Sequence, residues 1–323
     1  MLPIRNTIQS RNYPVVNSAI IAANILCYLI EMAHGDRLEQ FFIVYGLVPA
    51  RYSVPEIAAY FSWGQQVFSF FSFMFIHGGF WHLLGNMWSL YIFGDNVEDQ
   101  LGPFRYLFFY LLCGLVSGLS HLFLNLGSQV PTVGASGAIA GVMGAYFLLY
   151  PRSRILTLIP ILIIPYFVEL PAFVFLGIWF LIQFVSAAAT PVQGGGIAWW
   201  AHIGGFVFGM ICLKLFMRVP ETKFTQEIRK KTTKQKTPHL QVISTTGFAG
   251  APHLHGTITV TPSEAFLGTR KLVNIPWGFQ KRIFSVTIPP GVTESTTLRL
   301  TDLGKQTADH RRGDLYLKVE IQQ

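Results

Sequence analysis

Charged residues and cysteines are both scarce in this sequence of 323 residues. Asp, Glu, Lys and Arg make up only 12% of it, whereas 51% is hydrophobic and the mean hydropathy is +0.43. A chain with so little charge is too apolar to be one ordinary soluble domain, so a large part of it must lie in lipid. The cysteines each lie inside an apolar run without a CxxC pair, and we interpret them as packing residues. They are Cys27, Cys113 and Cys212.

Long hydrophobic runs are missing from the last third of the chain. Apolar stretches of about 20 residues, enough to cross a bilayer, recur between Val15 and Phe216, and none follows Met217. Residues 1–218 carry nine Lys and Arg against eight Asp and Glu, and residues 219–323 carry fifteen against eight, so the net charges are +1 and +7. The sequence therefore predicts a membrane domain at 1–218 and a basic, soluble part after it.

The basic excess begins at the end of the last apolar run. Its cluster at 214–236 fits both the positive-inside rule and an attraction to anionic cytoplasmic lipid. A solvated linker explains the cluster equally well. No aromatic and basic binding motif accompanies the pI of about 9.4, so we expect no nucleic-acid partner.

Six apolar runs are candidates for transmembrane helices. Six spans place both termini on one side, and most of the arginines that flank the runs fall on that side together with the 214–236 cluster. We therefore expect an α-helical polytopic membrane protein with both termini in the cytoplasm, in a bacterial cytoplasmic membrane. The first run lacks a cleavage signature and is interpreted as a retained span. The predicted spans are 15–32, 80–95, 103–125, 135–150, 171–188 and 198–217.

Two of the connecting segments have an unusual composition. Residues 33–79 are long, half polar and rich in aromatic residues, so we expect them in or against the outer leaflet. Residues 155–187 are interrupted by prolines and predict a short embedded piece followed by the fifth span, which we interpret as a lateral gate. The prolines are Pro160, Pro165 and Pro171.

Strongly polar side chains within spans are costly, so they are candidates for function by default. Ser136 follows a polar turn at the start of the fourth span, where unpaired N–H groups and the positive end of the helix dipole could stabilise an oxyanion. Gly134 would let the backbone approach closely. A serine in this place is more often an ordinary N-cap, so the catalytic interpretation requires a base. The polar candidates are His82, Asn86, His121, Ser136 and His202.

His202, near the start of the sixth span, supplies a base if the fourth and sixth spans touch. Both spans contain a small-xxx-small pattern, one beginning at Gly137 and one at Gly205. Such patterns let two helix backbones approach closely. The contact would bring the Ser136 hydroxyl within hydrogen-bond reach of the imidazole. The alternative is a lone histidine that hydrogen-bonds two helices.

His82 and Asn86 lie one turn apart on the second span. Both can donate hydrogen bonds into a dry site, which suits an oxyanion hole. For either residue alone, a bond to a neighbouring helix is the alternative, and it is the interpretation we favour for His121. His77 is expected to order the loop before this span.

Other hydrolytic mechanisms lack their residues. No HExxH motif is present, which argues against a zinc protease, and we expect no metal and no cofactor. The aspartates nearest a span, Asp95 and Asp99, lie in a cytoplasmic turn, where a salt bridge to Arg105 is the simpler interpretation. A paired-aspartate mechanism therefore fails too.

Three blocks of the sequence resemble the rhomboid family of intramembrane serine proteases in order, spacing and placement on successive spans. The blocks are HGGFWHLLGN at 77–86, GASG at 134–137 and AHIGG at 201–205. The resemblance covers roughly residues 15–217. It implies a six-helix fold and a Ser-His dyad without an aspartate.

The resemblance also implies a role for each matching residue. Ser136 would be the nucleophile and His202 the general base and acid. His82, Asn86 and the backbone amide of Ser136 would form the oxyanion hole. One departure is Ala140, at a position where some members have a tyrosine that stacks on the catalytic histidine.

The end of the chain resembles the C-terminal substrate-binding domain of DnaJ-type co-chaperones. The matching blocks are GTITVTPSEAFLG at 256–268, IPPGV at 288–292 and GDLYL at 313–317. Alternating strands at 257–260 and 316–319, with turns between them, predict a small all-β sandwich at 255–323 on their own. No HPD tripeptide is present, so stimulation of an Hsp70 ATPase through a J-domain is not implied. Residues 219–254 predict a basic, flexible linker.

Two functions remain open from the sequence. The first is a serine endopeptidase that cleaves transmembrane segments, with a cytoplasmic domain that binds client peptides. The second is a non-catalytic protein that holds membrane clients, and the intact Ser136 and His202 count against it. A channel or transporter has little in its favour, because no inverted repeat or charged pathway occurs. The expected partners are transmembrane protein substrates, the lipid bilayer and unfolded or client peptides.

Overall fold

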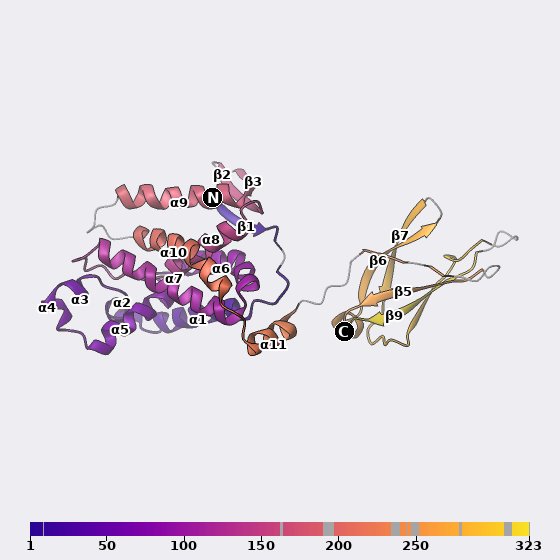
Figure 1. The fold of residues 1–323 in the computed structure, drawn as a ribbon, viewed down its shortest axis with the longest axis horizontal. Coiled ribbons are helices and arrows are strands. Elements are labelled where there is room, and N and C mark those ends of the chain that lie inside the picture. The colour runs from indigo at the N-terminus through magenta and orange to yellow at the C-terminus, as the bar shows by residue number, and fades with distance from the viewer. Residues whose placement is uncertain are drawn as a thin grey trace. The chain divides into compact units, whose positions relative to one another are not determined.

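The described part of the chain falls into two compact units, Met1–Thr233 and Lys234–Gln323 (Figure 1). The first is built mainly from helices and the second mainly from strands. The predicted fold class, a helical membrane part followed by a β part, is therefore confirmed. The computed structural model describes residues 1–8, 10–161, 164–189, 197–233, 240–243, 245–246, 252–277, 280–306 and 312–322.

Six helices coincide with the six predicted spans. They are α1 Val15–Met32, α6 Phe80–Leu101, α7 Pro103–Leu124, α8 Ser136–Leu149, α9 Ala172–Ala189 and α10 Trp199–Arg218. By length and composition, α1, α7, α9 and α10 can each cross a bilayer. α6 qualifies only as a bent pair with the helix before it, and α8 has 14 residues, a length of about 21 Å. The described residues thus contain four or five qualifying spans, and the count of six stays a prediction.

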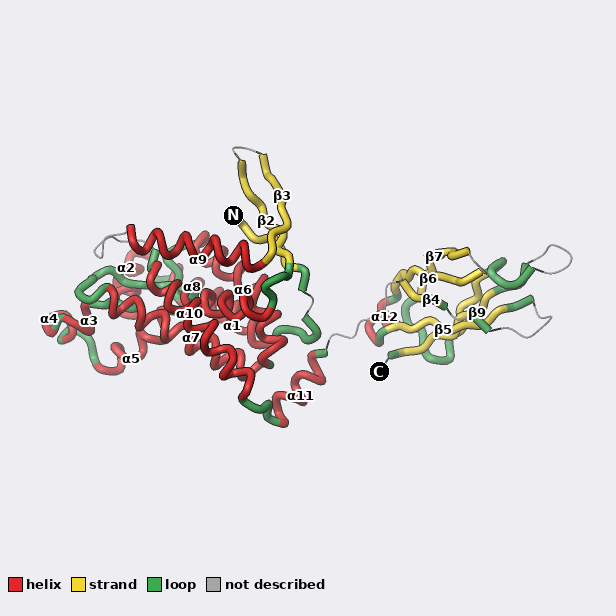
Figure 2. The backbone as a smooth tube through the Cα atoms, turned by 45° about the horizontal axis from the view of Figure 1, so that its top comes forward, coloured by secondary structure: helices red, strands yellow, loops and turns green. Residues whose placement is uncertain are grey.

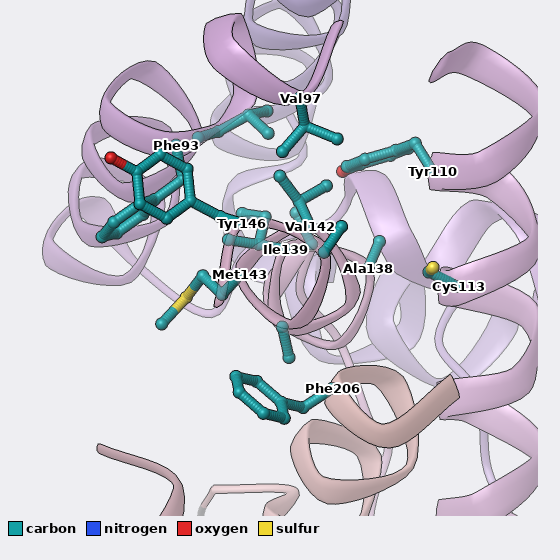
Figure 3. Packing of buried hydrophobic residues seen from close by; sticks show 14 of the residues in the cluster. Phe93, Val97, Tyr110, Cys113, Ala138, Ile139, Val142, Met143, Tyr146 and Phe206 are labelled. Atoms are coloured by element: carbon teal, nitrogen blue, oxygen red, sulfur yellow. The ribbon is translucent and has the colours of Figure 1, made fainter. Parts of the chain in front are cut away.

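Helix α8 lies at the centre of the helical unit. All ten residues of Gly137–Tyr146 are buried, and the helix packs against α6, α7 and α10. A helix that is apolar all round belongs in such an interior position. The start of α8 therefore lies among neighbouring helices. Figure 3 shows α8 surrounded by Phe93 and Val97 of α6, Tyr110 and Cys113 of α7, and Phe206 of α10.

The segment between α1 and α6 forms a succession of short helices. They are η1 Gly35–Arg37, α2 Leu38–Tyr45, α3 Ala50–Ser53, α4 Pro55–Ala58, α5 Trp63–Ser72 and η2 Phe73–Phe75. A capping box of Ser62 and Gln65 begins α5. The buried guanidinium of Arg51 donates to two carbonyl oxygens of α2 and lies 3.7 Å from the centre of the Phe61 ring. These contacts hold the segment together, and its place at the outer leaflet stays a prediction.

The embedded piece that we predict at the start of 155–187 is a β-hairpin instead. The strands are β1 Leu2–Asn6, β2 Arg154–Ile161 and β3 Ile164–Pro171, in the order β1-β2-β3 with antiparallel pairing (Figure 2). Pro160 lies opposite Pro165, beyond the part of β2 that pairs with β1, so neither proline interrupts the three-stranded part. Pro171 precedes α9, which contains no proline. The prolines therefore lie in the hairpin before the fifth span and not within α9, and the lateral gate stays a prediction.

The first part of the predicted linker 219–254 is helical. Helix α11, Lys223–Thr232, follows α10 and belongs to the first compact unit, which reaches Thr233. Its N-cap is Thr222, whose hydroxyl accepts a hydrogen bond from a backbone N–H of the first turn. Residues 240–242 form strand β4, which pairs with β6, so this part of the predicted linker belongs to the second unit. The remainder of the linker stays a prediction. Its residues 234–239, 244 and 247–251 lie outside the described residues.

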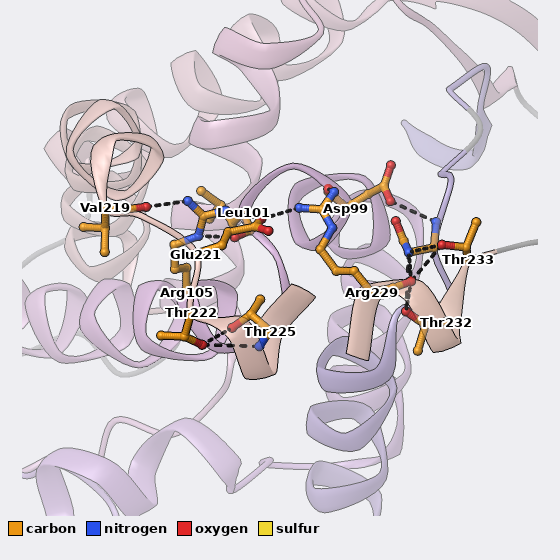
Figure 4. Close-up of polar contacts among 11 residues, drawn as sticks. Asp99, Leu101, Arg105, Val219, Glu221, Thr222, Thr225, Arg229, Thr232 and Thr233 are labelled. Atoms are coloured by element: carbon orange, nitrogen blue, oxygen red, sulfur yellow. Dashed lines mark hydrogen bonds and ion pairs between the residues drawn. The ribbon is translucent and has the colours of Figure 1, made fainter. Parts of the chain in front are cut away.

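The predicted salt bridge between Asp99 and Arg105 is wrong, and Asp95 and Asp99 lie within α6 and not in a turn. Arg105 donates to Glu221 Oε1 at 2.6 Å, and Arg229 of α11 donates to the same oxygen at 2.5 Å (Figure 4). The Asp99 carboxylate accepts the N–H groups of residues 11–12, at 3.0 and 2.9 Å. The carboxylate of Asp99 thus binds the N-terminal segment, and the guanidinium of Arg105 binds the turn after α10. We refer to Arg105, Glu221 and Arg229 as the ion-pair network.

The second unit consists of two three-stranded sheets around one core. β5 pairs parallel with β9 and β8 antiparallel with β9, whereas β4 pairs parallel with β6 and β7 antiparallel with β6. Apolar side chains of both sheets, such as Ile258, Val273 and Leu317, form the core. The predicted strands 257–260 and 316–319 lie within β5 and β9. The elements are β4 Leu240–Val242, β5 Leu254–Val260, α12 Pro262–Leu267, β6 Thr269–Trp277, β7 Gln280–Ile288, β8 Thr297–Leu300 and β9 Leu315–Ile321.

Candidate active site

Ser136 is the first residue of α8 and not its N-cap. The N-cap position is held by Ala135, and no side chain caps this helix. The hydroxyl of Ser136 lies 2.7 Å from Nε2 of His202, the residue at the fourth position of α10. The structure thus brings together the two residues that the sequence predicts as a dyad.

The turn before Ser136 depends on Gly134. This residue has a φ of +131°, a conformation that favours glycine. Its N–H donates to the carbonyl oxygen of Phe73 at 2.8 Å, which fixes the turn. A Cβ atom here would lie 2.8 Å from Cε1 of His82 and 3.6 Å from Oγ of Ser136. Only glycine therefore lets the turn fit beside the His82 ring.

Glycines bring α8 and α10 into backbone contact. A methyl group on Gly205 would overlap the carbonyl oxygen of Gly137, and one on Gly209 would overlap that of Gly141. With glycine at these positions the two helices approach far more closely than larger side chains would allow. This approach explains how a short serine side chain reaches the imidazole of His202.

His82 and Asn86 lie one turn apart on α6. The His82 ring sits beside the turn at Gly134, with its centre 5.2 Å from that of the His77 ring. Asn86 is 7% exposed, and its amide nitrogen has no hydrogen-bond partner among the described residues. An unpaired buried donor costs about 1–3 kcal/mol. The amide nitrogen of Asn86 is therefore a candidate hydrogen-bond donor for a group that binds beside it.

A buried carboxylate of α1 holds the loop before α6. Glu31 is 1% exposed and accepts the backbone N–H of His77 at 3.0 Å. The backbone of His77, and not its ring, therefore orders the loop. His121 contacts Asn125, the residue that caps the C-terminus of its own helix, with 3.3 Å between Nδ1 and the amide nitrogen, rather than a neighbouring helix as predicted.

Two residues of α9 complete the surroundings of His202, and sequence reasoning missed both. Oε1 of Gln183 lies 2.8 Å from Nδ1 of His202. The Trp179 ring is centred 5.9 Å from the imidazole at an angle of 33°, whereas Ala140 offers no aromatic ring. A polar residue inside an apolar span is costly, and this signal could have identified Gln183. No comparable signal distinguishes Trp179 from other aromatic residues of the span.

Residues 64–219 match the Rhomboid domain family, and residues 254–323 match the DnaJ C terminal domain family. This chain is a rhomboid-family protein fused to a DnaJ C-terminal domain. The candidate dyad, the candidate oxyanion donors and the α9 residues all lie within the matched rhomboid domain. The apolar helices and the family together make it an integral membrane protein.

Curated rhomboid relatives share part of this chain. It is 29% identical over 146 residues to "Rhomboid protein 1, mitochondrial" of Saccharomyces cerevisiae, covering 42% of this chain and 38% of the relative. It is 32% identical over 173 residues to "RHOMBOID-like protein 6, mitochondrial" of Arabidopsis thaliana, covering 52% and 50%. It is 27% identical over 169 residues to "Rhomboid-like protein 11, chloroplastic" of Arabidopsis thaliana, covering 51% and 58%.

The chain thus spans between 38% and 58% of the length of these curated relatives. The names of these three relatives place them in mitochondria and chloroplasts. The relatives therefore give no support to the predicted bacterial cytoplasmic membrane, and membrane integration alone is established for this rhomboid protein.

Proposed function

We propose that this rhomboid protein is a serine endopeptidase that cleaves transmembrane segments of membrane proteins. The observation that carries the proposal is the 2.7 Å separation of Ser136 Oγ and His202 Nε2, across which a proton can pass directly. The unpaired amide nitrogen of Asn86 adds support, because an oxyanion needs donors that no other group has taken.

The proposed reaction has two halves. Ser136 Oγ attacks the scissile carbonyl while His202 Nε2 takes the hydroxyl proton, and the oxyanion receives hydrogen bonds from His82, Asn86 and the Ser136 N–H. The intermediate collapses, the amine leaves with the proton from His202, and an ester remains on Ser136. A water molecule then attacks the ester, gives a proton to His202, and the serine leaves as a hydroxyl on receiving it.

We propose that the site opens toward the outer leaflet and that both termini are cytoplasmic. α7 begins next to Arg105 and the ion-pair network, at the end of the helical unit that the positive-inside rule assigns to the cytoplasm. α7 runs away from this end and α8 runs back toward it, so Ser136 belongs to the outer half. Water for the second half of the reaction would enter from there.

We propose that the DnaJ C-terminal domain binds unfolded or client peptides on the cytoplasmic side. The match at 254–323 supports a peptide-binding sandwich. Removing the chain after Thr233 tests this role. Loss of some clients with unchanged probe labelling is expected, whereas an unchanged client range would argue against recruitment.

A fluorophosphonate probe tests the protease, because it forms a covalent bond only with an activated serine. Wild-type protein in detergent should be labelled, and Ser136→Ala should not. A matched control is Ser120→Ala on α7, whose hydroxyl bonds the carbonyl oxygen of Val116 at 2.9 Å and which should keep full labelling. Folded wild-type protein that resists the probe would favour the alternative, a non-catalytic protein that binds membrane clients.

A further inference from the structure

The imidazole of His202 is held at both nitrogen atoms, and only one of its partners belongs to the dyad. Nε2 faces Ser136, whereas Nδ1 lies 2.8 Å from Oε1 of Gln183 on α9. His202 is 8% exposed and Gln183 is 5% exposed, so water cannot easily replace either contact. A buried glutamine within an apolar span is costly unless its amide is fully used.

The second hydrogen bond of Gln183 determines which way its amide faces. Nε2 of Gln183 donates to the backbone carbonyl oxygen of Trp179, one turn earlier on α9, at 3.1 Å. A carbonyl oxygen can only accept, so the NH₂ group must face Trp179. The amide oxygen therefore faces His202, and it too can only accept.

The orientation of the amide decides the tautomer of the neutral imidazole. An acceptor at Nδ1 requires the ring proton to be on Nδ1, which leaves a lone pair on Nε2. That lone pair faces the Ser136 hydroxyl and can take its proton. In the other tautomer Nε2 would carry the proton and could not act as the base.

We propose that Gln183 is a positioning residue that fixes His202 in the Nδ1–H tautomer required of the general base. When His202 takes the serine proton, the bond from Nδ1 to Gln183 becomes charge-assisted and therefore stronger. The interaction thus stabilises the imidazolium of the transition state more than the resting site. The catalytic part of this inference rests on the proposed function, whereas the tautomer does not.

A neutral amide suits this position better than a carboxylate. A carboxylate beside His202 would place a second charge in a buried site, at a large desolvation cost. Gln183 supplies an acceptor without that charge. The rings of Trp179 and Trp199, centred 5.9 and 6.2 Å from the imidazole, restrict its rotation further. The contacts of His202 with Trp179 and Gln183 thus take the place of the aromatic ring that is absent at Ala140.

Two substitutions separate hydrogen bonding from packing. Gln183→Met keeps the length of the side chain but removes the acceptor, and we expect the maximal labelling rate with the fluorophosphonate probe to fall about tenfold, with the half-saturating concentration unchanged within about twofold. Gln183→Glu keeps an acceptor. Its buried charge should lower thermal stability, but the folded protein should retain the labelling rate within about threefold. Leu181→Met, at a position of α9 that is 59% exposed, is the matched control and should label like wild type.

The tautomer can be measured without any variant of α9. In protein labelled with ¹⁵N-histidine, the His202 signals are identified by their absence in His202→Ala, and wild type should show a protonated Nδ1 and an unprotonated Nε2. A proton on Nε2, or an unchanged labelling rate in a folded Gln183→Met protein, overturns the inference. Wild-type protein that shows the Nδ1–H tautomer but resists the probe would instead count against the proposed protease.

Discussion

The two units of this rhomboid protein differ in how much apolar surface they expose. Both have a buried apolar core, but most of the exposed large apolar side chains of the described residues, such as Leu29 and Ile211, belong to the helical unit. The helical unit also buries polar residues such as Asn24, Glu31 and Asn86. In lipid, helices gain little from burying apolar surface, so close packing and internal hydrogen bonds must hold them together. The β unit relies on removing apolar side chains from water. Substitutions that disturb helix packing should therefore affect only the helical unit, and substitutions in the apolar core of the β unit should affect only that unit.

The largest effect is expected where α8 and α10 touch through their backbones. In Gly205→Val the new side chain would overlap the carbonyl oxygen of Gly137, and we expect a loss of more than about 3 kcal/mol of stability together with all probe labelling. Thermal unfolding in detergent measures the first and the fluorophosphonate probe the second. Gly177→Val is the matched control, because no atom lies within 4 Å of a Cβ at this position of α9. Equal losses in both variants would contradict the role of the glycine contact.

An intermediate effect is expected in the core of the β unit. Leu317 of β9 is fully buried, so Leu317→Ala should cost that unit about 3 kcal/mol through lost burial and a cavity. Labelling of Ser136 should be unchanged, since the helical unit is a separate compact body. Leu267→Ala, at a position that is 72% exposed, should change neither property. The comparison between the units fails if Leu317→Ala abolishes labelling while the helical unit stays folded.

The smallest effect on stability, with an unusual sign, is expected at Asn86. Replacing its unpaired amide with the side chain of leucine should raise stability by about 1 kcal/mol, because no buried donor is left unsatisfied. The proposed loss of an oxyanion donor should lower the rate of cleavage or labelling about 100-fold. Asn24→Leu on α1 is the control: its amide nitrogen bonds the carbonyl oxygen of Ile20 at 2.7 Å, and its removal should leave the rate unchanged. If Asn86→Leu cleaves substrate or is labelled faster than wild type, Asn86 does not belong to the proposed oxyanion site.

The meeting of Ser136 and His202 could be predicted because glycines at regular spacing on both helices allow a backbone contact that few other residues permit. The strands β5 and β9 could be predicted equally well, since alternating polar and apolar side chains indicate a half-buried strand. In each case a local pattern determines which face of an element is buried.

The remaining features depend on which elements become neighbours, and no local pattern records that. Gln183 reaches His202 only because α9 packs beside α10 with one particular rotation. The sequence pattern of an apolar run with prolines, such as the one at Pro160, fits a broken helix and a hairpin equally well. The charges of Asp99 and Arg105 are close in sequence, yet their partners lie 88 and 116 residues away.

The attachment of α11 has a mechanical consequence. Asn12 donates to the carbonyl oxygen of Arg229 at 2.7 Å, and the guanidinium of Arg229 donates to the carbonyl oxygen of Asp99 at 2.8 Å. A pulling force on the tail would enter the helical unit at Thr233, where these bonds tie α11 to the N-terminal segment and to the last turns of α6. His202 lies about 24 Å further along α10. We therefore expect tension on the tail to load these hydrogen bonds before it can alter the alignment of Ser136 and His202.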